Sequence, residues 1–266
     1  MKTGEILQQR LLPPLESEVL LARLLKQERT WILAHTEREL TIEEERQWNE
    51  WLERRARGEP VAYIIERTEF YGRPFIVRRG ALIPRPATEG LVSTALAWLG
   101  APSDTTIPTD AGIVAMARSL RSIGNITTVV DCGTGSGCIA VTLALERPDL
   151  RVIATDISEA ALSVARENAA LHGVSDRIDV RIGSLLEPVT GLTEPFLLVA
   201  NPPYVPGNRE LPRDIKEFEP PEAVFAGPEG LDVLRPLVSQ ATAHPFCAGF
   251  VIECEDEQVP MIDRRR

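Results

Sequence analysis

The chain has 266 residues, of which 44% are hydrophobic and 26% are charged, and its formal net charge is -10 at pH 7. This length allows one large domain and a small one, and the hydrophobic content allows a substantial core. The acidic excess repels a phosphate backbone overall, so direct binding to nucleic acid would need a local basic patch. The basic clusters at residues 54–57 and 78–79 are small, and we expect them to be solvated surface charge.

The cysteines and histidines give no sign of a metal site. No pair of cysteines has Cys-x-x-Cys spacing, the three histidines are scattered, and disulfides are not implied. The N-terminus lacks the apolar core of a signal peptide, and no apolar run is long enough to span a bilayer. The sequence therefore predicts a cytoplasmic protein with no membrane partner and no metal.

Residues 1–60 are expected to form a small helical domain. Apolar residues recur at helical spacing within residues 15–57, and Thr41-Ile42-Glu43-Glu44 is a capping box that starts a helix. Few of these residues have catalytic chemistry, so the expected role of this domain is to hold a partner.

A hairpin is expected to link this domain to the next. Gly58-Glu59-Pro60 breaks the helical pattern, and residues 61–86 contain strand-like stretches at 69–71 and 75–77 on either side of a turn. The main domain is then predicted to span residues 87–266.

Within the main domain, the first elements expected are a helix over 87–99, a polar loop over 102–110 and a short helix over 113–123. Strands and helices then alternate, with strands at 127–130, 151–155, 178–182, 196–200 and 250–254, and helices at 138–146 and 159–172. This alternation predicts an α/β fold, a Rossmann-like, doubly wound parallel sheet with right-handed crossovers. Ligands of such sheets bind outside the carboxyl ends of the strands.

A glycine loop, Asp131 to Gly137, joins the first of these strands to a helix. Glycine lets the backbone approach a ligand closely. The loop is no Walker motif, because no Gly-Lys-Ser/Thr follows, and no dinucleotide fingerprint, because its third glycine falls one residue early. Asp156 ends the second strand, about 20 residues after the glycines, where a carboxylate can hydrogen-bond both hydroxyls of a ribose.

The tetrapeptide Asn201-Pro202-Pro203-Tyr204 follows the apolar strand at 196–200. Its prolines fix φ and bias Asn201 toward an extended conformation, so the strand end is rigid. The Asn201 side-chain oxygen and the Pro202 carbonyl can accept the two hydrogens of a planar amino or amide nitrogen. Taken alone, the tetrapeptide could equally be a turn that closes a strand, but the glycine loop and Asp156 upstream strengthen the functional interpretation.

These residues resemble the class I S-adenosylmethionine-dependent methyltransferases and, more narrowly, the peptide-chain release factor glutamine methyltransferases. The resemblance runs from about Leu15 to Gln258, and it rests on the segments LESEVLLARLL, RRARGEPVAYI, EFYGRPFIV, LIPRPATE, DCGTGSGCIA, NPPY and AGPEGLD. The tetrapeptide NPPY is shared with enzymes that methylate the amino group of adenine, whereas the helical segment and the LIPRP loop favour the glutamine enzymes.

The resemblance implies S-adenosyl-L-methionine as the cofactor, with a binding set of Gly133, Thr134, Gly135, Ser136, Gly137, Asp156, Ser184, Leu185 and Asn201. It implies that Asn201 and Pro202 are catalytic and that, with Pro203 and Tyr204, they hold the substrate glutamine. The N-terminal helices would dock a class I release factor. The protein is then expected to act as a monomer without direct contact to nucleic acid.

The implied reaction is methylation of the glutamine side-chain amide in the Gly-Gly-Gln loop of a class I release factor. Three alternatives stay open: a ribosomal-protein glutamine methyltransferase, an adenine-amino methyltransferase acting on nucleic acid, and a cofactor-binding scaffold that has lost turnover. The sequence departs from the family pattern at Ala87, where Glu or Asp is usual, and at Ser184, where Asp is usual. Relatives usually continue with a final pair of strands, so an exposed edge is expected beside the strand at 250–254.

Overall fold

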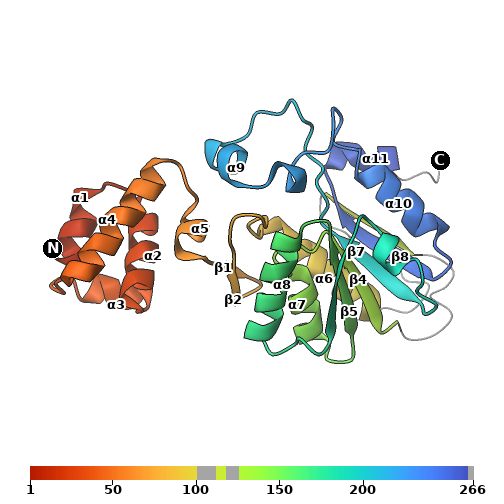
Figure 1. Cartoon of the computed structure of the whole chain (residues 1–266), viewed down its shortest axis with the longest axis horizontal. Coiled ribbons are helices and arrows are strands. Elements are labelled where there is room, and N and C mark those ends of the chain that lie inside the picture. The colour runs from red at the N-terminus through yellow and green to blue at the C-terminus, as the bar shows by residue number, and fades with distance from the viewer. Residues whose placement is uncertain (101–111, 118–125, 263–266) are drawn as a thin grey trace. The chain divides into compact units, whose positions relative to one another are not determined.

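The computed structural model describes residues 1–100, 112–117 and 126–262. The chain divides into two compact units, one of residues 1–67 with 212–218 and the other of residues 68–211 with 219–266. Figure 1 labels their elements. The helices of the first unit are α1 (Thr3–Gln9), α2 (Pro14–Leu25), α3 (Arg29–Ala34), α4 (Ile42–Ala56), α5 (Val61–Ile65) and α9 (Arg213–Phe218).

The first unit has its own hydrophobic core. Leu20 and Leu21 of α2, Ile32 of α3 and Trp48 of α4 are all buried in it. The predicted capping box starts α4: the Glu44 N–H donates to the Thr41 hydroxyl at 3.2 Å, and the Thr41 N–H donates to the Glu44 carboxylate at 2.7 Å. The predicted N-terminal helical bundle is thereby confirmed, while its docking role remains a prediction.

The predicted hairpin is also present. Strands β1 (Arg67–Phe70) and β2 (Arg73–Ile76) form a two-stranded sheet joined by Tyr71 and Gly72. Both connecting residues have positive φ, +53° and +69°, as the favoured two-residue hairpin turn requires.

The second unit is built on a six-stranded sheet in the order β3-β8-β7-β4-β5-β6. Its strands are β3 (Ile113–Ala117), β4 (Thr128–Cys132), β5 (Arg151–Asp156), β6 (Ile178–Ile182), β7 (Phe196–Ala200) and β8 (Cys247–Glu253). The strands from β8 to β6 are parallel, and β3 is antiparallel to β8. The predicted α/β class is confirmed, with one antiparallel strand added at the edge.

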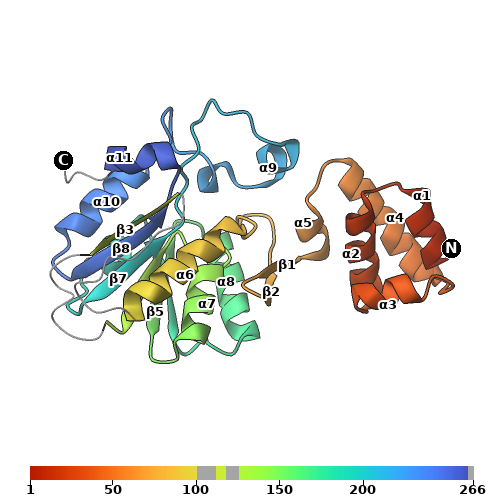
Figure 2. The ribbon, with the colours of Figure 1, turned by 180° about the vertical axis from the view of Figure 1, so that it is seen from behind.

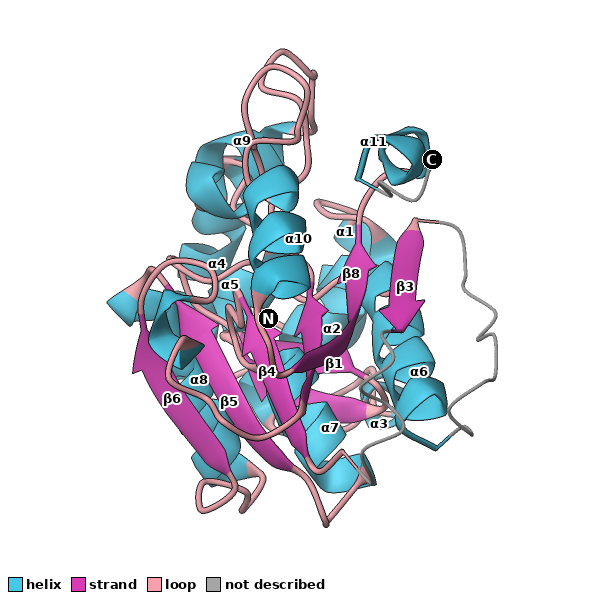
Figure 3. Ribbon diagram, turned by 90° about the vertical axis from the view of Figure 1, so that its right-hand side faces the viewer, coloured by secondary structure: helices cyan, strands magenta, loops and turns pink. Residues whose placement is uncertain are grey.

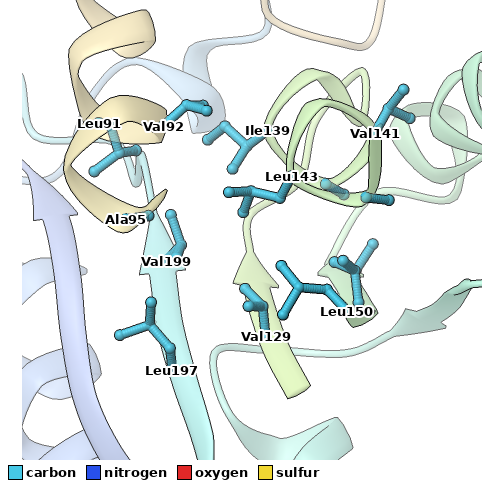
Figure 4. Close-up of a cluster of buried hydrophobic side chains, with 14 of the residues drawn as sticks. Leu91, Val92, Ala95, Val129, Ile139, Val141, Leu143, Leu150, Leu197 and Val199 are labelled. Atoms are coloured by element: carbon cyan, nitrogen blue, oxygen red, sulfur yellow. The ribbon is translucent and has the colours of Figure 1, made fainter. Parts of the chain in front are cut away.

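Helices cover both faces of the sheet, with α6, α7 and α8 on one face and α10 on the other (Figures 2 and 3). Their bounds, with those of the short helices, are α6 (Ala87–Gly100), α7 (Cys138–Glu146), α8 (Glu159–Leu171), α10 (Leu234–Ala243), α11 (Val259–Ile262) and the 3₁₀ turns Glu187–Val189, Pro221–Ala223 and Asp256–Gln258. Successive strand residues alternate between the two cores. Leu197 and Val199 pack under α6 and α7 (Figure 4), whereas Leu198 and Ala200 pack with α10.

Two expectations at the sheet edge are wrong. The segment Ile113–Ala117, expected as the start of a helix over 113–123, forms β3 instead. The edge of β8 is not bare, because β3 pairs along it from Ile113 opposite Glu253 to Ala117 opposite Gly249. The open backbone groups of β8 supply hydrogen-bond partners that outweigh the weak local helix preference of this segment. Residues 118–123 and the polar loop expected over 102–110 lie outside the described residues.

In the part of the chain that the structure describes, no helix has the length and apolar character needed to cross a membrane.

A buried amide joins three segments of the second unit. The Oδ1 atom of Asn168, on α8, accepts the Ile76 N–H at 2.7 Å. Its Nδ2 atom donates to the carbonyls of Ile76 at 2.9 Å and Ser136 at 2.8 Å. Asn168 has no exposed surface. The hairpin strand β2 and the glycine loop are therefore fixed to the same helix.

Asn168→Ala should lower the free energy of unfolding by roughly 3 kcal/mol, because the Ile76 N–H loses its acceptor and the Ile76 and Ser136 carbonyls each lose a donor in a buried site. Denaturant unfolding followed by circular dichroism would measure the change. Leu171→Ala, at an exposed position of the same helix, is the control and should change the free energy by less than about 1 kcal/mol. An unchanged midpoint for Asn168→Ala would contradict the bridging role.

Candidate functional site

Three parallel strands bring the predicted site residues to one place. Strand β4 lies between β7 and β5 (Figure 1), and Gly133, Asn201 and Asp156 lie at the carboxyl ends of these strands. All three residues line one pocket, which holds about 890 Å³ of free space with its mouth included. The strand order thus puts the glycine loop, which follows β4, between the ends of β7 and β5.

The glycine loop offers space rather than hydrogen-bond donors. The N–H groups of Gly133 and Thr134 both donate to the Thr155 carbonyl, at 2.8 and 2.9 Å, and the Gly137 N–H donates to the Thr134 carbonyl at 2.8 Å. The Gly135 N–H also has a protein acceptor, described below. A phosphate-binding loop would instead direct such N–H groups at the ligand.

The missing side chains of this loop explain its glycines. A Cβ atom on Gly133 or Gly135 would meet no atom within 4 Å, so these two positions face open space. A Cβ atom on Gly137 would lie 3.0 Å from Ala165, so this glycine permits close packing of the loop on α8. All three have positive φ, which also favours glycine.

Asp156 holds the loop and faces the pocket. One carboxylate oxygen accepts the Gly135 N–H at 2.9 Å and the other accepts the Ser158 N–H at 2.9 Å. Burial raises the pKa of Asp156, the backbone hydrogen bonds lower it, and the charge of Glu222 raises it further. Each carboxylate oxygen can accept more than one hydrogen, so Asp156 can still bind hydroxyl groups of a ligand.

The charges around the pocket have one sign. Asp156 and Glu222 line it, and no lysine, arginine or histidine is among the described residues that do so. Such a pocket disfavours phosphate groups and favours cationic or hydroxyl-bearing ligands. Sequence reasoning missed Glu222. Its position directly after Pro220-Pro221 and before the apolar residues 223–225 was a visible signal.

The end of β6 contributes a further wall. Ser184 and Leu185 line the pocket, as does Ile157, which sequence reasoning missed. Ile157 is apolar and yet 60% exposed. Its position directly after Asp156 is the sequence signal that could have revealed it. Leu185 has a φ of +50°, and its carbonyl accepts the Cys132 thiol at 3.4 Å.

Three residues of the expected cofactor set do not line the pocket. Thr134 and Ser136 are buried, and they and Gly137 lie behind the open positions of the loop. The structure gives each a role in shaping the loop, through the Thr134 hydroxyl, the Ser136 carbonyl and the packing of Gly137.

The tetrapeptide after β7 is divided between the pocket and its support. Asn201, Pro202 and Pro203 line the pocket, and the Asn201 Nδ2 donates to the Thr88 hydroxyl at 2.9 Å. Tyr204, expected to bind substrate, is not among the lining residues, and its hydroxyl donates to Glu253 at 3.0 Å.

The AGPEGLD stretch and the LIPRP loop hold this rim from two sides. The Val205 N–H donates to the Val224 carbonyl at 3.0 Å, and the Ala226 N–H donates to the Val205 carbonyl at 3.0 Å. Buried Glu219 accepts Arg85 at 2.5 Å and the Ile83 N–H at 3.3 Å. Glu219 precedes Pro220, which lines the pocket, so this carboxylate positions that wall of the site.

A second carboxylate lies under the glycine loop. The Oδ2 atom of Asp131 accepts the Thr134 hydroxyl at 2.6 Å and the Ala140 N–H at 3.1 Å. Its Oδ1 atom is buried and has no hydrogen-bond partner in the described structure. Burial raises the pKa of Asp131 to about 7, although both hydrogen bonds act against the rise.

In the described ranges, no group of three or more His, Cys, Asp or Glu residues is placed to hold a metal ion. The four cysteines are buried free thiols.

Asp131→Asn should remove a pH dependence of stability. The pKa of Asp131 in the folded chain is raised to about 7, above its unfolded value. Below about pH 4 the carboxyl is protonated in both states, and its contribution to stability is complete. As the pH rises toward 7 the unfolded chain loses this proton first, so the folded state loses stability. Relative to the variant, the wild type should lose about 2 kcal/mol of unfolding free energy between about pH 5 and about pH 8. Denaturant unfolding at both pH values would measure this, and a constant difference would contradict it.

Comparisons with known proteins agree with this geometry. Residues 2–65 match the family model described as "PrmC N-terminal domain", and residues 106–218 match "Methyltransferase small domain". A protein of Koribacter versatilis (strain Ellin345) named "Release factor glutamine methyltransferase" is 39% identical over 87% of this chain and 75% of its own length. A protein of the same name from Xylella fastidiosa (strain Temecula1 / ATCC 700964) is 37% identical over 89% of this chain and 78% of its own length.

Among solved structures, a ribosomal protein L11 methylase from Lactobacillus delbrueckii subsp. bulgaricus matches with a TM-score of 0.41. It is 22% identical and covers 74% of this chain and 76% of that chain, a likeness too low to carry an argument. The two family models and the curated relatives carry the assignment instead. The chain belongs to the family of release factor glutamine methyltransferases.

Proposed function

We propose that this protein methylates the side-chain amide nitrogen of the glutamine in the Gly-Gly-Gln loop of a class I peptide chain release factor, in the cytoplasm. The methyl donor is S-adenosyl-L-methionine. The observation that carries the proposal is the position of Asn201, which lines the same pocket as Gly133 and Asp156. An acceptor suited to an amide nitrogen therefore shares one space with the glycine loop and the strand-end carboxylate.

The residues of the pocket fit this cofactor. S-adenosyl-L-methionine supplies an electrophilic methyl group on a sulfonium cation. The open positions at Gly133 and Gly135 leave room for its methionine part, and a pocket whose charged lining residues are carboxylates suits a cation. Asp156 would accept the ribose hydroxyls. Ile157, Ser184 and Leu185 would border the adenine.

Asn201 and Pro202 would act on the substrate by orientation. An amide nitrogen is a poor nucleophile because its lone pair is delocalised into the carbonyl group. The Asn201 Oδ1 atom and the Pro202 carbonyl can each accept one hydrogen of the nitrogen, which favours rehybridisation and directs the lone pair at the methyl group. Orientation of this kind can contribute on the order of 7–11 kcal/mol.

The acidic pocket gives no support to the alternative in which the protein methylates adenine in nucleic acid. A phosphate backbone near Asp156 and Glu222 would meet two carboxylates and no lining cation among the described residues. Methylation assays that offer RNA, ribosomal protein and release factor separately would distinguish the alternatives directly.

Asn201→Ala should reduce methyl transfer to a release factor by roughly 100- to 1000-fold, because one oriented acceptor is lost. Labelled S-adenosyl-L-methionine and peptide mass mapping would measure the rate and identify the modified glutamine. Calorimetry should find cofactor affinity little changed.

The control for this variant is Asn208→Ala, the same substitution at an exposed position of the loop that follows, which should keep the wild-type rate. Near-normal turnover by Asn201→Ala would mean that the tetrapeptide is only a turn.

The helical unit is the proposed docking surface for the release factor. Four large apolar side chains of this unit are strongly exposed, Leu11, Leu15, Leu33 and Ile42, and Ile42 reaches 88%. Exposed apolar groups are suited to contact with a protein partner.

Replacing these four residues by serine should raise KM for the release factor by roughly tenfold or more, because apolar contacts are lost, while cofactor affinity stays unchanged. Steady-state kinetics with varied release factor would measure it. The control is the pair Leu171→Ser and Met261→Ser, exposed apolar positions of the other unit. An unchanged KM for the fourfold variant would contradict docking through these side chains.

A further inference from the structure

A chain of buried polar groups lies behind Asn201. The Asn201 Nδ2 donates to the Thr88 hydroxyl at 2.9 Å, and the Tyr204 hydroxyl donates to the Glu253 Oε1 at 3.0 Å. Thr88, near the start of α6, is 2% exposed, and Glu253, the last residue of β8, is 4% exposed. Strands β7 and β8 pair with Ala200 opposite Ile252, so Glu253 lies beside Asn201 at the end of the sheet.

One oxygen of Glu253 lacks a conventional partner. Its Oε2 atom is buried with no hydrogen-bond donor in the described structure. Burial raises the pKa of Glu253, and the hydroxyls of Thr88 and Tyr204 both lower it, so both hydroxyls stabilise the charged carboxylate. Because burying a carboxylate is unfavourable unless donors surround it, its presence here calls for an explanation. Tyr204 donates to Oε1, and the Thr88 hydroxyl also lowers the pKa of Glu253, so Thr88 is the candidate donor for Oε2.

The donor-to-acceptor direction of these hydrogen bonds determines how the Asn201 amide is oriented. An ionised carboxylate only accepts hydrogen bonds, and a hydroxyl has a single hydrogen to donate. If Thr88 donates its hydrogen to Glu253, its oxygen can only accept from Asn201, which must then present its NH₂ group to Thr88. Since the amide is planar, its oxygen points the other way, to the pocket that Asn201 lines. In the reverse orientation, the NH₂ group of Asn201 would face the NH₂ group of the substrate glutamine.

We propose that Glu253 and Thr88 are positioning residues, which hold the Asn201 amide with its oxygen directed at the substrate nitrogen. This inference rests on the function proposed above. Neither residue lines the pocket. Glu253 acts on Asn201 through the Thr88 hydroxyl. Through the Tyr204 hydroxyl it acts on residues 202–204, which follow Asn201.

The test compares two substitutions of Thr88 in the full-length chain. Thr88→Val removes the hydroxyl at nearly constant volume, and Thr88→Ser keeps it. With a release factor and labelled S-adenosyl-L-methionine, Thr88→Val should lower kcat by roughly 10- to 100-fold, as loss of an orienting partner does at other sites. Thr88→Ser should keep most of the wild-type kcat. Calorimetry should give all three proteins the same cofactor affinity.

A matched control is available on α7. Thr142 is fully buried and its hydroxyl has no hydrogen-bond partner in the described structure. Thr142→Val therefore makes the same chemical change away from the site, and it should retain the wild-type kcat and thermal midpoint.

A double-mutant cycle separates orientation from simple damage. Glu253→Gln removes the charge that sets the direction of the Thr88 hydroxyl, so it should also lower kcat. If both residues act on Asn201 through the same series of hydrogen bonds, the double variant Thr88→Val with Glu253→Gln should be no slower than the slower of the two single variants. Losses that multiply would overturn the proposal.

The remaining outcomes are equally decisive. A wild type that leaves the release factor unmodified overturns the proposed function and this role with it. An active wild type with an equally active Thr88→Val variant overturns the positioning role alone. Loss of cofactor affinity and of the thermal midpoint in Thr88→Val, without rescue by Thr88→Ser, would show that the residue is structural and would also overturn it.

Discussion

The common direction of β7, β4 and β5 is the constraint on which the site depends. These strands are hydrogen-bonded in parallel register, so their carboxyl ends meet at one edge of the sheet. Asn201 and Gly133 follow two of those ends, Asp156 is the last residue of β5, and all three share a pocket although they are far apart in the chain. Helices on both faces bury β4 and β7 completely, which makes this edge a rigid base. A loop-borne site would lack that precision, and methyl transfer to a weak nucleophile depends on orientation.

Much of this arrangement could be predicted from local patterns. The apolar run at Phe196–Ala200 and the helix at Cys138–Glu146 have the predicted limits, because prolines and glycines mark their ends. The strand β3 could not be predicted in this way. Its state depends on the open edge of β8, a partner distant in sequence, and local propensity carries no record of such a partner.

The site, too, has residues that local sequence patterns predict and residues that they do not. Gly133, Asp156 and Asn201 each lie at the carboxyl end of a strand, so their convergence could be predicted from strand order alone. The relation of Thr88 to Asn201 and Glu253 could not, because it arises where the start of a helix meets the ends of two strands. These supporting residues look ordinary in the sequence. Only their burial and the Asn201–Thr88 and Tyr204–Glu253 hydrogen bonds reveal that polar groups lie behind Asn201.

The pairing of β3 with β8 also affects the order in which the sheet can be completed. Strand β3 is synthesised before the glycine loop, whereas its partner strand emerges from the ribosome long afterwards, since Ile113 pairs with Glu253. In the described structure β8 is the strand beside β3, so the backbone groups of β3 that bond to it must stay hydrated until β8 has been translated. Contacts between such distant segments slow folding and leave strand edges exposed meanwhile. The region proposed to bind the cofactor, built on β4, β5 and β6, can therefore form on the nascent chain before the strand that carries Glu253 exists.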